Sequence, residues 1–168
     1  MNISDAYNQL NDWINISNGG YIYDDDSDEL YSFSHIRTYT DNELLEFELN
    51  NNFKLPVEYK SFLTHVGCVN IFSGEKTSGI EILSPFDISD FSRSVFYNFG
   101  DDLYPKLLLT TSIPKFGYLG GFWMGEKSPV NYGIFYPEIP SEYWVEECNF
   151  VNFNGWVINL IEFKAKKI

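Results

Sequence analysis

Hydrophobic and polar residues change their spacing along this chain, and the change falls at Gly67. In the segment before that glycine, apolar residues recur every three or four positions, which is the period of an amphipathic helix. The clearest example is residues 55–67, where Pro56 suits the first helical turn and Gly67 suits the stop. The apolar face of this predicted helix comprises Tyr59, Phe62, Leu63 and Val66.

Helical spacing and capping residues mark three other segments. Ser4 can cap a first helix, which ends before Asn18. Thr40 and Glu43 have the spacing of a capping box, which predicts a short helix starting there. Residues 87–99 place apolar side chains at helical intervals and form a further predicted helix.

After Gly67 the apolar residues fall in short aromatic and β-branched runs separated by glycine and proline, which is typical of strands. Strands are predicted over residues 69–72, 80–83, 107–111, 118–124, 132–136 and 143–150, with an earlier brief strand over 21–23. Helical spacing returns at residues 153–161, where Asn152 or Asn154 can cap a closing helix.

This order of elements predicts an α+β fold. A length of 168 residues fits a single domain, and no segment has the composition of an interdomain linker. We expect a single mixed, mainly antiparallel sheet of about six strands. Helices should pack on one face of this sheet and leave the other at least partly open, and a C-terminal helix should close the fold.

The chain is strongly acidic. Lys+Arg 11 against Asp+Glu 24 gives a net charge of −13. Such a charge repels the phosphate backbone of nucleic acids and the anionic face of a membrane, so we expect neither as a partner. Basic proteins are favoured partners instead.

The negative charge is concentrated in the first part of the chain. Residues 1–50 carry Arg37 as the only cation against eleven carboxylates, a net charge of −10, whereas the remaining residues carry −3. Lys164, Lys166 and Lys167 follow the closing helix, where they would complement its negative end.

Cysteine content and terminal sequence favour a cytoplasmic protein. Cys68 and Cys148 are too few for a disulfide framework, which favours a reducing compartment. The amino terminus has neither the cationic start nor the apolar run of a signal peptide. No uncharged apolar stretch approaches the ~20 residues that a membrane span requires.

Motifs for catalysis and cofactor binding are weak. Gly120 and Gly125 have the separation found in a phosphate-binding loop, but Glu126 occupies the lysine position and Pro129 prevents the helix that should follow. The chain has no G-x-S-x-G motif and no paired spacing of zinc ligands. We therefore expect no catalytic residues, cofactor or metal ligands. An enzyme would have to rely on geometry that sequence patterns do not reveal.

The acidic segment at residues 24–29 is the leading candidate for function. Asp24, Asp26 and Asp28 imitate the start of an EF-hand, but Glu29 stands where that loop requires glycine, so a weak cation site and a solvated loop both remain open. The third interpretation is a binding loop, because carboxylates steer basic partners and tyrosines anchor them. The candidate partner-binding residues are Asp24, Asp25, Asp26, Asp28, Glu29, Tyr23 and Tyr31.

The motif L-P-x-x-Y-K-x-F-L at residues 55–63, followed by Gly67, resembles the entry motif of the SUKH superfamily, the Smi/Knr-type family named from a yeast regulator of cell-wall glucan synthesis. The likeness continues to roughly residue 163, through segments that resemble a strand passing into a helix, a glycine-rich strand and a closing helix. Residues 68–70 depart from it, because the family usually has glycines there. Residues 1–40 have no counterpart, and we interpret them as a lineage-specific extension packed on a single domain of residues 1–168.

The resemblance implies a non-enzymatic α+β binding module. Bacterial members of the family are mostly immunity proteins, which protect a cell by binding polymorphic toxins, often nucleases. A basic nuclease domain would fit an acidic inhibitor, because the cleft that attracts phosphate also attracts carboxylates. The alternative is a regulatory or scaffold module in cell-wall synthesis or signalling, with no toxin partner.

Overall fold

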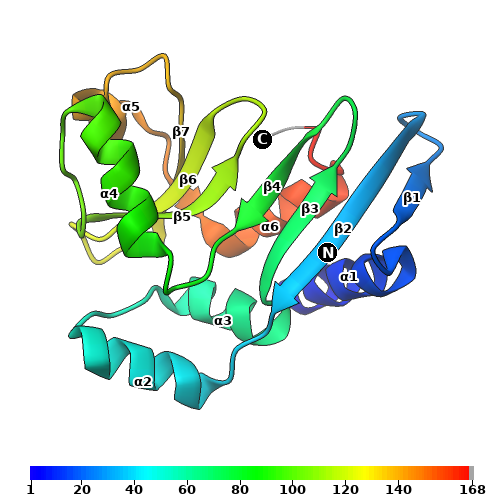
Figure 1. Ribbon diagram of the computed structural model, residues 1–168, viewed down its shortest axis with the longest axis horizontal. Coiled ribbons are helices and arrows are strands. Elements are labelled where there is room, and N and C mark those ends of the chain that lie inside the picture. Colours follow the sequence, from blue (N-terminus) through cyan, green and yellow to red (C-terminus); the bar gives the residue numbers. More distant parts are fainter. Residues whose placement is uncertain (167–168) are drawn as a thin grey trace.

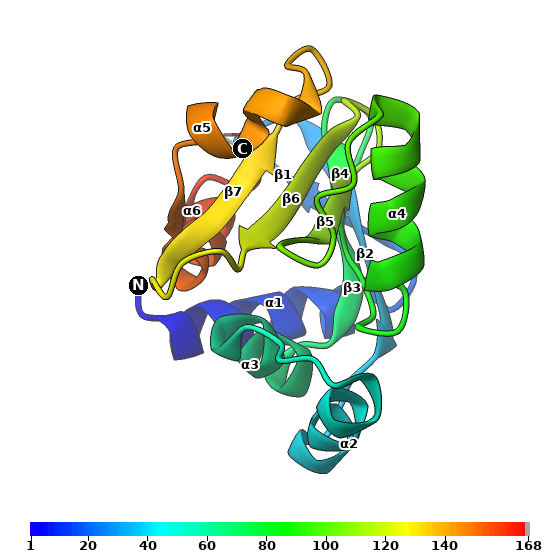
Figure 2. The same ribbon diagram turned by 90° about the vertical axis from the view of Figure 1, so that its left-hand side faces the viewer.

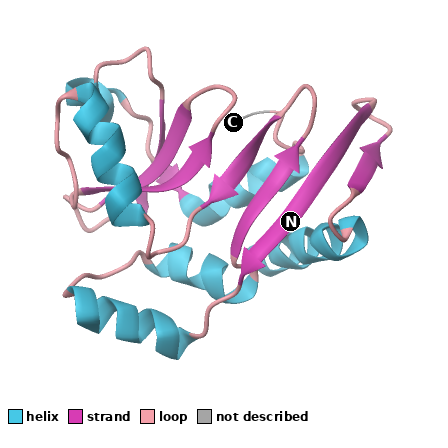
Figure 3. Ribbon diagram, viewed as in Figure 1, coloured by secondary structure: helices cyan, strands magenta, loops and turns pink. Residues whose placement is uncertain are grey.

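The computed structural model describes residues 1–166, and one eight-stranded sheet organises them (Figures 1 and 3). The strands lie in the order β1 to β8, and each pairs antiparallel with its sequence neighbours. The sheet is therefore a meander without parallel pairs. Its strands are β1 Tyr21–Asp24, β2 Glu29–Arg37, β3 Cys68–Ser73, β4 Ser78–Ile82, β5 Leu107–Ile113, β6 Tyr118–Trp123, β7 Val130–Phe135 and β8 Val151–Asn152.

Helices cover both faces of this sheet (Figure 2). α1, α3 and α6 contact one another on one side, α4 lies on the other side against β5, and α2 stands away from the sheet. Their bounds are α1 Ile3–Ser17, α2 Asp41–Asn51, α3 Val57–His65, α4 Ile88–Phe99, α5 Trp144–Glu147 and α6 Phe153–Glu162, with a short 3₁₀ helix at Ser141–Tyr143.

Side chains that accept backbone N–H groups set the helix starts. The predicted capping box of α2 is confirmed: the Glu43 N–H donates to Thr40 Oγ1 (3.2 Å) and the Thr40 N–H donates to Glu43 Oε2 (2.8 Å). The predicted cap Ser4 is wrong, because it already lies inside α1. Asn2 caps that helix instead, accepting the Asp5 N–H over 2.9 Å.

The motif residues at 55–63 connect α3 to its neighbours. The Tyr59 hydroxyl donates to the Leu83 carbonyl at the end of β4, over 2.5 Å. Lys60 Nζ lies 3.0 Å from Glu48 Oε1, and the same buried carboxylate accepts the Leu55 N–H over 2.8 Å. The motif therefore fixes α2 and β4 to α3 and has a structural role.

The main core lies between the sheet and the group α1, α3 and α6. Valine and isoleucine pairs from β3 and β4 face it, among them Val69 opposite Ile82 and Ile71 opposite Ile80. Asn152, one of the two predicted caps, caps α6. The Phe153 and Trp156 rings of this helix pack on Tyr132 of the sheet, and Phe153 also packs on Phe122.

A second, smaller core lies on the opposite face, beneath α4 and α5. It comprises Phe96, Leu107, Leu109, Leu119, Phe135 and Trp144. β5 alternates between the two cores, with Leu108 in the main core and Leu107 and Leu109 in the second. The expectation that helices pack on one face is therefore wrong at this end of the sheet, because leucines on both faces of β5 need cover.

Strand content also differs from the expectation of about six strands. β2 and β8 were not predicted, and residues 143–150 are wrong as a strand. That segment begins with the 3₁₀ helix and α5, and the Trp144 indole donates to the Ile139 carbonyl (2.8 Å) while its ring stacks on Phe135. Packing of one tryptophan into the second core overrides the strand propensity of its neighbours.

Residues 1–40 supply α1, β1 and β2, and β2 pairs directly with β3. They are part of the same sheet and core as the rest of the chain, and their interpretation as a lineage-specific extension stays a prediction. Among residues 1–166, no helix combines the length and the apolar character that crossing a bilayer demands.

Candidate functional site

The sheet face that carries α4 is uncovered over β1 to β4 (Figure 1). Tyr23 lies directly opposite Leu30, and Tyr21 lies opposite Ser32. Residues paired directly across antiparallel strands point to the same face, so the register defines this surface. We call it the open face; it comprises Tyr21, Tyr23, Leu30, Ser32, Ser34, Asn70, Ser73 and Glu81.

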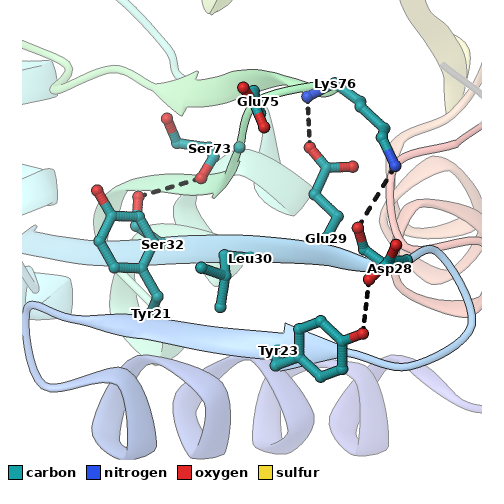
Figure 4. Close-up of a pocket in the computed structure, with 10 residues that line it drawn as sticks. Tyr21, Tyr23, Asp28, Glu29, Leu30, Ser32, Ser73, Glu75 and Lys76 are labelled. Carbon is teal, nitrogen blue, oxygen red and sulfur yellow. Dashed lines mark hydrogen bonds between the residues drawn. The ribbon is translucent and has the colours of Figure 1, made fainter.

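A groove of about 670 Å³ crosses one end of the open face, between β1–β2 and the hairpin that joins β3 to β4 (Figure 4). One wall carries Tyr21, Tyr23, Asp28 and Leu30, and the hairpin wall carries Ser73, Glu75 and Lys76. The Tyr23 hydroxyl donates to Asp28 Oδ1 over 2.6 Å, and this bond raises the pKa of Tyr23. The groove therefore presents aromatic rings beside carboxylates.

The acidic turn, residues 24–29, connects β1 to β2 beside this groove. Its first residue, Asp24, is buried and bound by Lys164, Lys166 and Ser27. Burial raises the pKa of Asp24, but the hydrogen bonds from Lys164 and Ser27 and the two lysine charges outweigh it and bring the pKa to about 2. Lys164 Nζ also lies 3.1 Å from Asp26 Oδ2. Lys164 and Lys166 therefore stabilise the acidic turn; Lys167 lies outside the described residues.

Glu29, at the other end of the acidic turn, binds the β3–β4 hairpin. Its Oε1 accepts the backbone N–H groups of Lys76 (2.5 Å) and Thr77 (3.1 Å). Lys76 Nζ in turn donates to the carbonyl oxygens of Ser27 (3.2 Å) and Asp28 (3.4 Å). A Cβ on Gly74 would lie 2.5 Å from Glu29 Oε1 and 2.9 Å from the Leu30 carbonyl oxygen, so only glycine allows this approach.

The structure divides the predicted partner-binding residues into two groups. Asp24, Glu29 and Tyr31 are buried, at 7%, 5% and 3% exposure, and bind other parts of the chain. The exposed group comprises Tyr23, Asp25, Asp26 and Asp28. Binding of a partner by any of these residues stays a prediction. In the folded chain, only the four exposed residues could contact a partner.

Most of the groove lining lies outside the predicted partner-binding set. The residues concerned are Tyr21, Leu30, Ser32, Ser73, Gly74, Glu75 and Lys76. A signal for Leu30 was present, because it alternates with the inward-facing Tyr31 and Phe33 at the two-residue period of a half-buried strand. Glu75 and Lys76 had no such signal, since only the register of β2 against β3 brings their hairpin beside the acidic turn.

The side chains of this site are carboxylates and tyrosines, which are common at binding surfaces. Within residues 1–166, no three His, Cys, Asp or Glu side chains form a group that could hold a metal ion. Asp24 and Asp26 converge on Lys164 rather than on a shared centre. Exposed carboxylates beside tyrosine rings bind cationic groups by charge, hydrogen bonding and cation–π contact.

Comparison with known proteins identifies the family. No family model matches the chain. Over all 168 residues of both chains, it is 65% identical to Immunity protein RhsIB of Dickeya dadantii (strain 3937). The chain belongs to the RhsIB family of immunity proteins. Its membership of the SUKH superfamily stays a prediction, and the relative's name gives no support to the scaffold alternative.

Two surfaces of this RhsIB-family protein therefore meet at one end of the sheet. The acidic turn contributes Asp25 and Asp26, and the groove contributes Tyr21, Tyr23 and Leu30. Residues 1–40 supply both surfaces except for the second wall of the groove, which comes from the β3–β4 hairpin.

Proposed function

We propose that this chain is an immunity protein that neutralises a cognate toxin by binding and occluding it. The observation that carries the proposal is the 65% identity over full length to a protein named as an immunity protein. The exposed carboxylates and tyrosines at one end of the sheet support a binding role, because steering charge and aromatic anchors are common at protein interfaces. The chain itself would break and form no bonds.

We propose further that the toxin domain is a basic nuclease. The net charge of −13 supports this assignment, since a nuclease must attract phosphate and an acidic inhibitor can occupy the same cleft. The location that we propose is the cytoplasm. Cys68 and Cys148 are free thiols, which is usual for proteins of a reducing compartment.

Paired production of the chain and the toxin domain encoded next to its gene tests the proposal. Cells that make the toxin domain alone should stop growing, whereas cells that also make the chain should grow normally. Death of cells that contain both proteins overturns the immunity function. Growth without a complex that survives purification overturns the binding mechanism.

The nature of the toxin is tested separately. The purified toxin domain should cut DNA or RNA, and the chain should abolish cutting when it reaches one equivalent. A toxin domain without nuclease activity overturns the nuclease assignment and leaves the immunity function unchanged.

A further inference from the structure

We propose that the groove on the open face is the docking surface of this protein, and that its occupant is a basic segment of the toxin. This inference rests on the proposed function and adds to it the surface, its anchoring residues and the chemistry of the contact. It assigns Tyr21, Tyr23 and Leu30 as anchors and Asp28 and Glu75 as the groups that bind cationic side chains.

Three large side chains are exposed together on one short stretch of the sheet. Tyr21, Tyr23 and Leu30 are 68%, 54% and 51% exposed, and all three line the groove. At the other end of the same face, large side chains are covered by α4 and α5. Tyrosine is enriched among the residues that dominate binding energy, because it buries much area at little entropic cost.

The charges around the groove select a cationic occupant. Asp28 and Glu75 line it, and Asp25 and Asp26 lie beside it in the acidic turn. Among the described residues, the Glu75 carboxylate has no hydrogen bond or ion pair. Two cations lie nearby, and both bind backbone oxygens: Lys76 donates to the carbonyl oxygens of Ser27 and Asp28, and Lys115 donates to the carbonyl oxygen of Glu75. Asp26 is paired with Lys164, but within residues 1–166 no ion pair involves Asp25, Asp28 or Glu75. An arginine or lysine of the occupant would meet these three carboxylates and the tyrosine faces.

A second copy of the chain does not fit this surface. Each copy carries a net charge of −13 and would bring the same carboxylates against their own images across a two-fold axis. Like charges placed opposite one another disfavour such a contact. A toxin with a phosphate-binding cleft carries the opposite charge, so the proposed partner fits where a second copy does not.

Hydrogen bonds and an ion pair connect the walls of the groove in the unbound chain, which favours tight association. Glu29 fixes one wall to the other through the Lys76 and Thr77 amides, and Lys164 fixes the acidic turn. Ser32 Oγ also donates to the Ser73 carbonyl across the groove, over 3.2 Å. A preformed surface loses little conformational entropy when its partner docks.

Tyrosine substitutions on the two ends of the face test the inference. Tyr21→Ala and Tyr23→Ala remove ring anchors from the groove, and Tyr97→Ala is the matched control, because Tyr97 is 87% exposed on α4. The purified toxin domain encoded next to the gene is the probe, and dissociation is followed by surface plasmon resonance. Each groove variant should dissociate roughly 10- to 100-fold faster than the unmodified chain, whereas Tyr97→Ala should not differ from it.

Tyr23→Phe and Glu75→Gln separate the ring from the charge. Tyr23→Phe keeps the ring and should dissociate within about threefold of the unmodified chain. Glu75→Gln should weaken binding most at low salt, since its effect is electrostatic. Equal far-ultraviolet circular dichroism and thermal midpoints among the variants establish that each is folded.

Outcomes of this experiment separate the inference from the proposed function. If the unmodified chain fails to bind the toxin domain, the proposed function fails. If it binds, and Tyr21→Ala and Tyr23→Ala dissociate no faster than Tyr97→Ala, the docking surface is wrong and the function stands. A concentration-dependent dimer that Tyr21→Ala abolishes also overturns the inference, because the groove would then be a contact between copies.

Discussion

The two ends of one sheet face differ in their side chains and in whether helices cover them. Over β5 to β7, that face carries leucine and phenylalanine, and α4 and α5 cover it. Over β1 to β4 the same face carries serine, asparagine, glutamate, exposed tyrosine and one exposed leucine, Leu30, and no helix of residues 1–166 covers it (Figure 1). The side chains at alternate positions of the strands therefore decide which part of the sheet stabilises the fold and which part remains available to a partner.

The free energy of apolar burial explains why helices cover one end of the face. A leucine or phenylalanine that leaves water contributes about 1.5–3 kcal/mol, so three or four of them on neighbouring strands can hold a helix in place. Ser32, Ser34 and Asn70 offer no such gain. Their strands instead rely on the other face, where Tyr31 and Phe33 pack against Phe72.

The largest effect should come from removing a ring from the covered end. Phe96 is 1% exposed, and Phe96→Ala should lower the free energy of unfolding by about 3–5 kcal/mol, since it leaves a cavity in the second core. Urea unfolding followed by tryptophan fluorescence measures the change. Tyr97→Ala, one residue further along α4, should change it by less than about 0.5 kcal/mol. Similar losses for the two variants would show that α4 is not held by this core.

The second effect distinguishes two neighbouring carboxylates of the acidic turn. Because the pKa of Asp24 is about 2 in the folded chain, against 3.8 for an unperturbed aspartate, its ionised form stabilises the fold above pH 4. That stability, about 2 kcal/mol, is lost as the pH falls from 4 toward 2. Asp24→Asn should therefore be less stable than the unmodified chain at pH 7 and equal to it near pH 2.

Asp25→Asn is the matched control, since Asp25 is exposed and takes part in none of the ion pairs of residues 1–166. Its unfolding free energy should follow that of the unmodified chain at every pH. An Asp24→Asn difference that persists at pH 2 would assign the loss to packing rather than to charge.

The third effect concerns the rate of association. Replacing Asp25 and Asp26 together by asparagine should slow capture of the toxin domain by about three- to tenfold at low salt and flatten its salt dependence, because long-range attraction is weakened. Glu146→Gln with Glu147→Gln removes the same charge from α5, at the covered end. Stopped-flow fluorescence gives both rates. Equal slowing by the two double variants would mean that total charge, and not its position, sets the rate.

The smallest change in stability should come from a substitution of a small polar residue on the open face. Ser34 is exposed and pairs across the strands with Asn70. Ser34→Ala should change the free energy of unfolding by less than about 0.5 kcal/mol. A loss above 1 kcal/mol in urea unfolding would contradict the division of the face into a stabilising end and an available end.

Local signals in the sequence predicted much of the fold. The capping box at Thr40 and the spacing of residues 55–67 act within one or two helical turns, and the structure places α2 and α3 there. The strands at residues 69–72 and 107–111 were likewise predicted from composition alone, and they lie within β3 and β5. Such features depend on neighbours in the chain, so no knowledge of the tertiary structure was needed.

Long-range contacts account for the errors. Residues 143–150 have strand-like composition, yet Trp144 turns inward to Phe135 and the segment becomes helical. The division of the face depends on the register of seven strands, β1 to β7, which the pattern of one strand does not contain. The burial of Asp24 could not be predicted either, because its partner Lys164 lies 140 residues away.

The pairing of Asp24 with Lys164 also has a consequence for biosynthesis. A ribosome adds about 5–20 residues per second, so the 140 residues between the two partners take roughly 7–28 s to make. Until Lys164 has been synthesised, Asp24 of the nascent chain lacks this partner. A messenger RNA cut short before codon 164 would yield a polypeptide that lacks Lys164 and therefore cannot form its ion pair with Asp24.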